Sequence, residues 1–218
     1  PFDDVRVRQA FSAAIHREAL TRSAYQGGYT PAFSLSQPGM GGYQPSALLT
    51  AGPEEARTLL AAAGYPGGKG FPRLEIMSFT NELNQRLLEA IQQMWREHLG
   101  VEVVIALREA KVHLDALRTG TFDIAFATAI PDAADPAAML GDFMTDAALN
   151  YPRWSDAAFD RAVSAGRWDE AETALRNGTP IAPLYYNTKV WLLSPRVIGW
   201  WEDGLWARCY QGIRLEAR

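Results

Sequence analysis

The sequence predicts an α/β fold with a parallel or mixed sheet flanked by helices. Three apolar segments, residues 73–79, 101–107 and 122–128, have the composition of buried strands. Amphipathic helices are expected between them, at 82–99 and 109–118, so the order is strand, helix, strand, helix, strand. Strands that are joined through helices run parallel, with right-handed connections, and become neighbours in one sheet.

The N-terminal part is expected to hold two helices separated by a long irregular segment. Residues 4–25 have the pattern of one amphipathic helix, capped by Asp3 or Asp4. Glycines and prolines interrupt residues 26–52, and irregular segments of this length are usually functional or pack across another surface. A short helix is expected at 53–63. The arginines of the first helix are interpreted as a solvated face: Arg6, Arg8, Arg17 and Arg22.

The C-terminal part is predicted to contain further helices and short strands. Ser155 is the expected cap of its second helix, and Gly178 is expected to end the third. No clean linker divides the chain into independent domains. The expected helices are 135–144, 155–164 and 168–177, and the expected strands lie within 180–193 and at 207–215.

The composition is that of a globular protein with a substantial core. Hydrophobic residues make up 48% and charged residues 21% of the 218 residues. The net charge of −4 argues against a nucleic-acid partner, which requires a basic surface. Cys209 is the only cysteine, which excludes an internal disulfide and a cysteine-based zinc site. The chain opens at Pro1 without a methionine, so we expect a processed or truncated product.

The residues offer no clear catalytic or metal-binding arrangement. His16, His98 and His113 lie on different predicted helices, and no histidine pair has the spacing of a zinc site. The sequence also lacks a nucleophile elbow, a dinucleotide-binding glycine motif and a phosphate-binding loop. Asp132 and Asp135 could form a carboxylate pair, but such pairs normally come from different segments that face a cleft. We therefore expect no enzyme, no cofactor and no metal.

A ligand site is expected where the parallel strands end. In open α/β sheets the ligand binds beyond the carboxyl ends of the strands, because loop amides and helix N-termini converge there. Thr80–Asn81 follows the first strand, and residues 128–132 follow the third. Asp132 would place a carboxylate at the cleft edge, suited to an ammonium group. The alternative is that Asp132 only caps a turn beside Pro131.

Several segments, in the same order along the chain, resemble one family. The match starts at PFDDVRVRQAFSAAIHREAL and covers nearly the whole chain, although no single motif is specific alone. The chain is similar to the oligopeptide-binding family of ABC-importer substrate-binding proteins, whose lobes have the periplasmic-binding-protein-like (type II) fold. The other matching segments are PGMGGYQP at 38–45, EEARTLLAAAGYPGG at 54–68, Trp95 with Gly100-Val101, EAKVHLDALRTGTFDIA at 109–125, DAADP at 132–136 and IAPLYYN at 181–187.

The resemblance implies a two-lobed clamp that captures a peptide or similar small solute and delivers it to a membrane permease of the ABC type. Residues 1–218 would form its C-terminal lobe, with 195–218 as returning C-terminal strands and the N-terminal lobe outside this sequence. The location implied is periplasmic or extracytoplasmic, with a lipid anchor as a further option in the full-length protein.

The resemblance also implies site residues, position by position. The main chain of Thr128, Ala129 and Ile130 would pair with an extended ligand, as in strand addition. Asp132 would receive the ligand's α-ammonium group, and Asn84 would lie near its far end.

The chain also departs from the family. The tryptophan expected three residues before Asp132 is Ala129, and the family's EWK is EAK at 109–111, so ordinary oligopeptide specificity is in doubt. The stretch between Phe159 and Ile181 is shorter than usual in the family, either because residues were deleted or because a mobile loop is missing from this sequence. These losses leave an alternative function, a ligand-sensing or protein-interaction module of a regulator. A tryptophan-rich tail favours it slightly: Trp200, Trp201 and Trp206.

Overall fold

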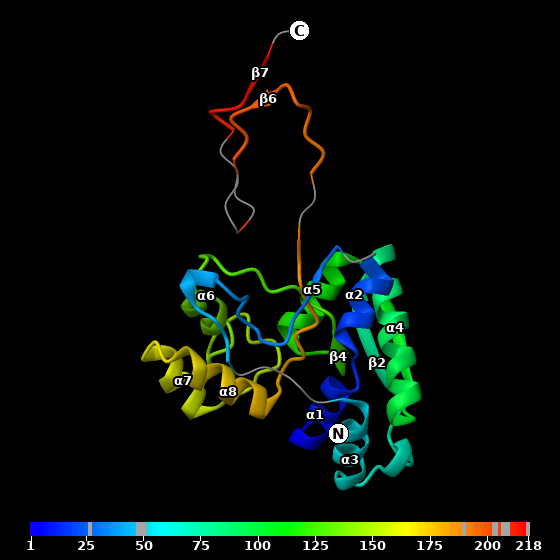
Figure 1. Ribbon diagram of the computed structural model, residues 1–218. Helices are drawn as coiled ribbons and strands as arrows, with labels where there is room; N and C mark the ends of the chain where they lie inside the picture. Colours follow the sequence, from blue (N-terminus) through cyan, green and yellow to red (C-terminus); the bar gives the residue numbers. More distant parts are fainter. Residues whose placement is uncertain (26–27, 47–51, 189–190, 202–204, 206–209, 217–218) are drawn as a thin grey trace.

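The computed structural model contains the predicted parallel sheet (Figure 1). The strand order is β3-β2-β4, and β2 pairs in parallel with both neighbours. The α/β prediction is therefore confirmed, and this sheet is parallel throughout. Its strands are β2 (Leu74–Phe79), β3 (Val103–Arg108) and β4 (Ile124–Ala125). The structure describes residues 1–25, 28–46, 52–188, 191–201, 205 and 210–216.

Helix α4 (Glu82–Leu99) has the bounds that the sequence predicts and packs against β2 and β3. It begins at Asn81, whose side-chain oxygen accepts a hydrogen bond from the Leu83 amide at 2.9 Å. It ends at Gly100 with φ of 70°, where a Cβ atom would lie 2.4 Å from the Gly67 carbonyl oxygen, so only glycine fits. Its buried face carries Leu87, Leu88, Ile91, Trp95 and Leu99.

The N-terminal segment forms two helices instead of the single helix expected over 4–25. Helix α1 spans Val5–Ala13, and α2 spans Arg17–Tyr25. Arg17 is only 3% exposed, which corrects its interpretation as part of a solvated face. Its guanidinium donates a hydrogen bond to the Ser12 carbonyl at 3.1 Å. The helix is interrupted here, and the buried guanidinium bonds carbonyl groups that have no α-helical partner beyond the end of α1.

Residues 28–46 are the described part of the irregular segment expected at 26–52, and they contact the C-terminal helices. Its strand β1 (Thr30–Pro31) pairs antiparallel with β5 (Tyr185–Tyr186), and a 3₁₀ turn, η1, follows at Met40–Gly42. Helix α3 (Pro53–Ala62) and a second 3₁₀ turn, η2 (Pro66–Gly68), come next and pack together.

Helix α5 follows β3 and packs on the sheet. It spans Ala110–Thr119 and contacts β2. The Glu109 carboxylate caps it by accepting the Lys111 amide at 3.0 Å. Gly120, with φ of 72°, ends it and leads the chain toward β4.

One hydrophobic cluster joins α1, α3 and α4 to the sheet, and a second hydrophobic cluster lies among three helices of the C-terminal part. They are α6 (Pro136–Gly141), α7 (Ala157–Ser164) and α8 (Trp168–Gly178). Phe159 and Leu140 are fully buried in this cluster. Helices α7 and α8 join through a turn at 165–167, so the region between Phe159 and Ile181 is a compact helical hairpin.

Two helix ends differ from the prediction. Asp156, not Ser155, caps α7, and its carboxylate accepts the Ala158 amide at 2.8 Å. Helix α8 continues through Gly178, and the left-handed residue after it is Thr179, with φ of 45°. Gly178 is glycine for another reason, because a Cβ atom there would lie 2.7 Å from the Trp154 ring. The need for glycine at 178 therefore comes from a tryptophan that is distant in the sequence.

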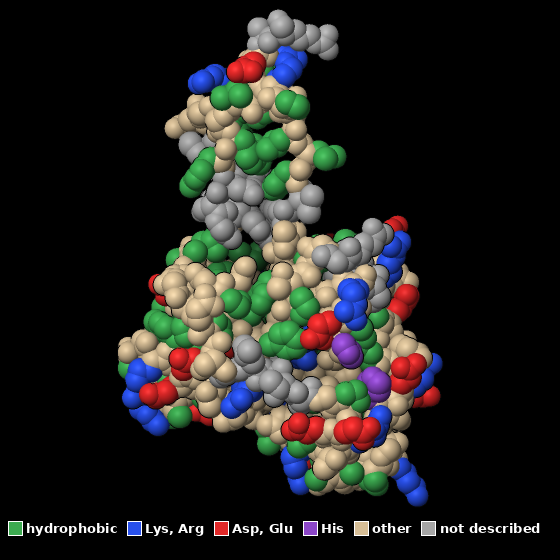
Figure 2. Space-filling model, viewed as in Figure 1, with side chains coloured by type: hydrophobic (Ala, Val, Ile, Leu, Met, Phe, Trp, Pro, Cys, Tyr) green, Lys and Arg blue, Asp and Glu red, His purple; other side chains and the backbone are tan. Residues whose placement is uncertain are grey.

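The last described residues form a hairpin that stands away from the body (Figure 1, orange to red). In it β6 (Val197–Ile198) pairs antiparallel with β7 (Arg214–Leu215). The regular strands are shorter than those expected within 180–193 and at 207–215. Residues 189–190 and 206–209, which include Trp206 and Cys209, lie outside the described residues. Apolar side chains lie along the hairpin (Figure 2).

Candidate ligand-binding site

The segment that follows β4 leaves the sheet with its main chain unpaired. The ladder between β4 and β2 is much shorter than the strand expected over 122–128. The Phe126 amide still donates to the Met77 carbonyl at 2.8 Å. From 127 to 130 no main-chain group is hydrogen-bonded to the described part of the chain. Because β4 is an edge strand, these donors and acceptors are open to another chain.

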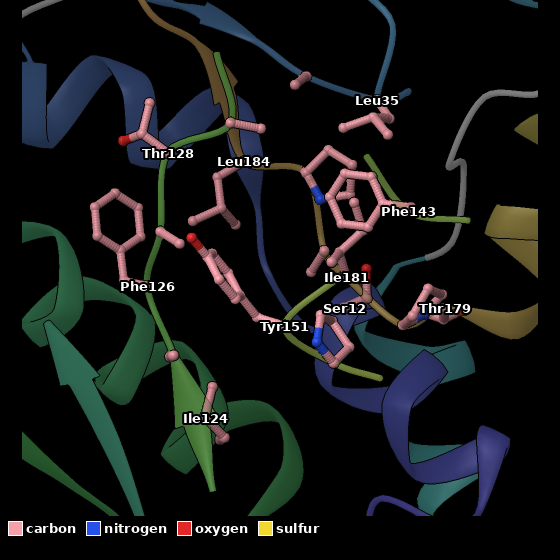
Figure 3. Close-up of a pocket in the computed structure, with 18 of the residues that line it drawn as sticks. Ser12, Leu35, Ile124, Phe126, Thr128, Phe143, Tyr151, Thr179, Ile181 and Leu184 are labelled. Atoms are coloured by element: carbon pink, nitrogen blue, oxygen red, sulfur yellow. The ribbon is translucent and has the colours of Figure 1, made fainter. Parts of the chain in front are cut away.

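A cavity of about 990 Å³ lies beside this unpaired segment (Figure 3). Residues 124–131 form one wall, which includes the predicted residues Thr128, Ala129 and Ile130. The second hydrophobic cluster forms another wall through Phe143, and the segment 179–187 closes a further side. Small-molecule sites have volumes of roughly 300–1,000 Å³, so the cavity is large enough for a ligand or a large part of one.

Two carboxylates stand at the edge of the cavity. Asp132 is exposed and follows Pro131, which lines the cavity. Asp142, at the end of α6, lines the cavity and is half-buried. Burial raises the pKa of Asp142, and the negative charge of Asp132 raises this pKa further. Sequence reasoning missed Asp142, because only the fold brings the end of α6 to the cavity.

The alternative was that Asp132 caps a turn beside Pro131, but its carboxylate makes no hydrogen bond to the described part of the chain. Asp135 caps α6, and its carboxylate accepts the Ala137 amide at 2.7 Å. The side chain of Asp132 lies in the bend that precedes α6 and is exposed. It is therefore accessible to a charged group of a ligand.

The other predicted segment at this sheet edge serves the fold. The side-chain oxygen of Asn81 caps α4, and the Thr80 hydroxyl donates to the Arg108 carbonyl at 3.1 Å. Asn84 is buried, and its amide donates to the Ser78 hydroxyl at 3.0 Å. The side chains of Thr80, Asn81 and Asn84 do not line the cavity. The structure thus brings Asn84 together with β2 and not with residues 128–132.

His113 on α5 supports the unpaired segment from behind. It is only 5% exposed, and its imidazole hydrogen-bonds to the Phe126 carbonyl. Its Nδ1 atom is buried and has no hydrogen-bond partner in the described part of the chain. Burial lowers the pKa of His113, and the positive charge of Arg108 lowers it further. The ring is therefore uncharged at neutral pH and holds the start of the segment in place.

Comparison with known proteins decides the family. Residues 1–151 match the middle region of the bacterial extracellular solute-binding proteins, family 5. This chain belongs to that family. The family 5 proteins are solute-binding proteins of transport systems, a class that binds its solute without converting it. The family confirms the resemblance on which the expectation of a non-enzymatic binding protein rested.

The relatives of this family 5 chain include peptide-binding proteins. The periplasmic oligopeptide-binding protein OppA of Salmonella typhimurium is 30% identical over 221 residues, which cover 92% of this chain and 40% of that protein. The periplasmic murein peptide-binding protein MppA of Escherichia coli is 30% identical over 217 residues, with the same coverage. The chain therefore spans about 40% of the length of these relatives.

Solved structures agree with the fold of this family 5 chain. The Escherichia coli murein tripeptide binding protein MppA matches with a TM-score of 0.82 and 30% identity, over 91% of this chain and 42% of that one. Listeria monocytogenes OppA bound to peptide matches over 100% of this chain and 46% of that one, with a TM-score of 0.86 and 24% identity. The type II binding-protein fold expected from the resemblance is confirmed.

The described part of this family 5 chain was also searched for metal sites and membrane-spanning helices. No group of three or more histidine, cysteine, aspartate or glutamate side chains there could hold a metal ion. Nor does any described helix have the length and apolar content needed to cross a membrane. Ala110 and Ala129 stand at the two positions where the resemblance led us to expect tryptophans. Both are exposed, and of the two only Ala129 lines the cavity.

Proposed function

We propose that this chain is the C-terminal lobe of the substrate-binding component of an ABC importer, and that it captures a peptide or a similar solute. The observation that carries the proposal is the unpaired main chain at 127–130, which lies beside an edge strand and along a cavity. An extended peptide can add to such an edge, because main-chain hydrogen bonds recognise it independently of its sequence. The peptide-binding names of the relatives support this solute class.

In this proposal the carboxylates select the end of the solute that carries a positive charge. Asp132 is exposed beside the unpaired segment, and Asp142 lines the cavity. A free α-ammonium group placed near them is attracted by both charges, and it relieves their mutual repulsion. The ligand would then run from Asp132 back along 130–127 toward β4.

The hairpin supports an N-terminal lobe that closes over this one. Trp191, Leu193 and Trp201 are 38%, 45% and 58% exposed, and Leu192 is fully exposed. Apolar side chains gathered on a projecting element mark a surface that another body of protein covers (Figures 1 and 2). We propose that residues 195–218 return to that lobe and help to form the hinge between the lobes.

The cellular setting follows from the same proposal. The relatives are named periplasmic, so we place the whole protein in the periplasm or another extracytoplasmic space. A lipid anchor would hold it there where no periplasm exists. Its partner would be an ABC permease in the membrane, to which the closed protein delivers the solute.

Calorimetric titration of the whole gene product tests the proposal. The ligands are a random tripeptide mixture and the same mixture with acetylated N-termini. We expect the free-amine peptides to bind, and acetylation to weaken binding about tenfold or more. Asp132→Asn should weaken the free-amine peptides to a similar degree and leave the acetylated ones unchanged.

A matched variant controls for the loss of charge. Asp115→Asn removes a carboxylate from the exposed face of α5 and should leave both affinities as they are. If Asp132→Asn has no more effect than this control, Asp132 is not the ammonium site. If no peptide binds and mass spectrometry of the purified protein finds a different solute, the peptide assignment is wrong.

A further inference from the structure

A buried histidine fixes the point at which the unpaired segment begins. His113 lies on the buried face of α5, and α5 packs against β2. Its imidazole hydrogen-bonds to the carbonyl group of Phe126, the last residue before the unpaired main chain at 127–130. The Phe126 amide donates to the Met77 carbonyl at 2.8 Å. The direction in which the chain leaves β4 is therefore set by β2 through the amide and by α5 through the carbonyl.

The surroundings of this imidazole favour its neutral form. His113 is only 5% exposed, and from β2 the Phe79 ring contacts it with 6.0 Å between centroids. From β3 comes the positive charge of Arg108, which is paired with Glu75 of β2 and which opposes a second positive charge nearby. The other titratable residues of α5, of its cap and of the loop beside it are exposed or half-buried: Glu109, Lys111, Asp115, Arg118, Tyr151 and Arg153.

Protonation would change what the ring can do at this position. A neutral imidazole has one N–H group, and here the Phe126 carbonyl accepts it. An imidazolium carries an N–H on both nitrogens, and the one at Nδ1 would be buried without an acceptor in the described part of the chain. Because a buried charge without a partner is costly, the charged ring turns toward water or the segments around it move apart. Either movement breaks the contact with the Phe126 carbonyl.

We propose that His113 is a positioning residue that makes solute binding depend on pH: the neutral ring holds the start of the segment 127–130 for the ligand, and the protonated ring releases it. The inference rests on the proposed function, because it takes this segment as the ligand's binding site. Burial lowers the pKa of His113 from 6.5, so affinity is highest above about pH 6.5 and falls as pH drops through the folded pKa. The protein would thus hold its solute less tightly in acidic surroundings.

Calorimetric titration of the whole gene product with the free-amine tripeptide mixture, at about pH 7.5 and about pH 5, tests the inference. Burial raises the pKa of Asp142, which also takes up a proton as pH falls, so wild type is compared with a variant. His113→Gln keeps an N–H donor for the Phe126 carbonyl but cannot be protonated. We expect the wild-type loss of affinity to exceed that of His113→Gln by about threefold or more. Equal losses would overturn the inference.

Two further variants make the result specific to this ring. His113→Phe has an aromatic ring without a donor or a titrating proton, so its affinity should depend on pH no more than that of His113→Gln. His16→Gln removes an exposed histidine of the N-terminal segment and should keep the wild-type pH dependence. If His16→Gln weakens the pH dependence as much as His113→Gln does, the effect does not come from the position behind the segment, and the inference is wrong.

Histidine NMR of the whole gene product tests the same coupling from the other side. If the ligand binds only while the ring is neutral, then by linkage saturating peptide must lower the pKa of His113. The signals of His16 and His98 serve as internal controls and should titrate alike with and without peptide. A titration of His113 that bound peptide leaves unchanged would overturn the inference, and the peptide function would stand.

Hydrogen exchange without any ligand separates the inference from the proposed function. The protection factor of the Phe126 amide, which is bonded to Met77, reports whether the start of the segment is held. If no peptide binds, but this protection falls in acid in wild type and not in His113→Gln, the peptide function fails and the histidine switch stands. If no peptide binds and the two proteins show the same protection at both pH values, both fail.

Discussion

The guanidinium of Arg17 donates a hydrogen bond to the main-chain carbonyl of Pro183, with 2.7 Å between Nε and the oxygen. This contact ties the break between α1 and α2 to the segment that closes one side of the cavity. Burial lowers the pKa of Arg17 to about 10, so the side chain stays charged at neutral pH. A buried cation here holds together parts of the chain that are far apart in sequence.

Replacing Arg17 should destabilise the fold strongly. Arg17→Met keeps an unbranched side chain but leaves the carbonyls of Ser12, Ile15 and Pro183 without this donor. We expect the free energy of unfolding to fall by about 2–4 kcal/mol, measured by urea denaturation. Arg22→Met, on the exposed side of α2, is the control and should stay within about 0.5 kcal/mol of wild type. Equal effects of the two variants would contradict this role.

Glu172 of α8 should make stability depend on pH. Its carboxylate accepts the amides of Ser36 and Leu35, at 2.7 and 3.2 Å, and it is only 2% exposed. Burial raises its pKa above the 4.5 of an unfolded chain, against the effect of these hydrogen bonds. The folded protein therefore binds this proton more tightly than the unfolded chain does, and stability falls as pH rises from about 4.5 through the folded pKa.

The measurement compares wild type with Glu172→Gln over a series of pH values. Glutamine cannot ionise, so the free energy of unfolding of wild type relative to the variant should be greatest near pH 4 and decline above it. A difference that grows with rising pH would show that the hydrogen bonds outweigh burial and that the pKa is lowered instead.

His113 should give the opposite pH dependence. Burial lowers its pKa below the 6.5 of an unfolded chain, so below pH 6.5 the unfolded chain takes up a proton that the folded protein resists. The free energy of unfolding should fall as pH drops from about 6.5 to the folded pKa. In His113→Phe this decline should be weaker, while the ring contact with Phe79, now at 6.0 Å between centroids, is kept. If the free energy of unfolding changed with pH in the same way in wild type and His113→Phe, His113 would not be the cause of the decline.

Gly178 should not tolerate a methyl group. In Gly178→Ala the new Cβ atom would lie 2.7 Å from the Trp154 ring, so the ring or α8 must shift. We expect a loss of about 1–3 kcal/mol in thermal or urea unfolding. Gly141→Ala is the matched control, because nothing lies within 4 Å of its Cβ position and alanine favours the helix. The control should be neutral or slightly stabilising; equal losses would show that Trp154 adapts.

The sequence was sufficient for the sheet and its helices because their signals are local. The apolar runs and the helical period predict β2, α4 and α5 closely, and Gly100 ends α4 through a backbone preference that acts within a few residues. Asn81, which was expected in the ligand site, caps α4 instead. The same ordered segments pointed to the family, and the position of 128–130 after the third strand placed them at the cleft.

Only the tertiary structure decided the features that depend on distant partners. The sequence predicts Arg17 as a surface cation, but in the fold its side chain is buried and bonds the Pro183 carbonyl. It predicts Gly178 as the end of a helix, but in the fold the position is glycine because the Trp154 ring packs against it. Asp142 and Tyr151 carry no local signal of a site. Asp142 and Tyr151 line the candidate site because α6 and the loop after it face β4 across the cavity. Such packing depends on side-chain volumes and on contacts between distant segments, which no local periodicity encodes.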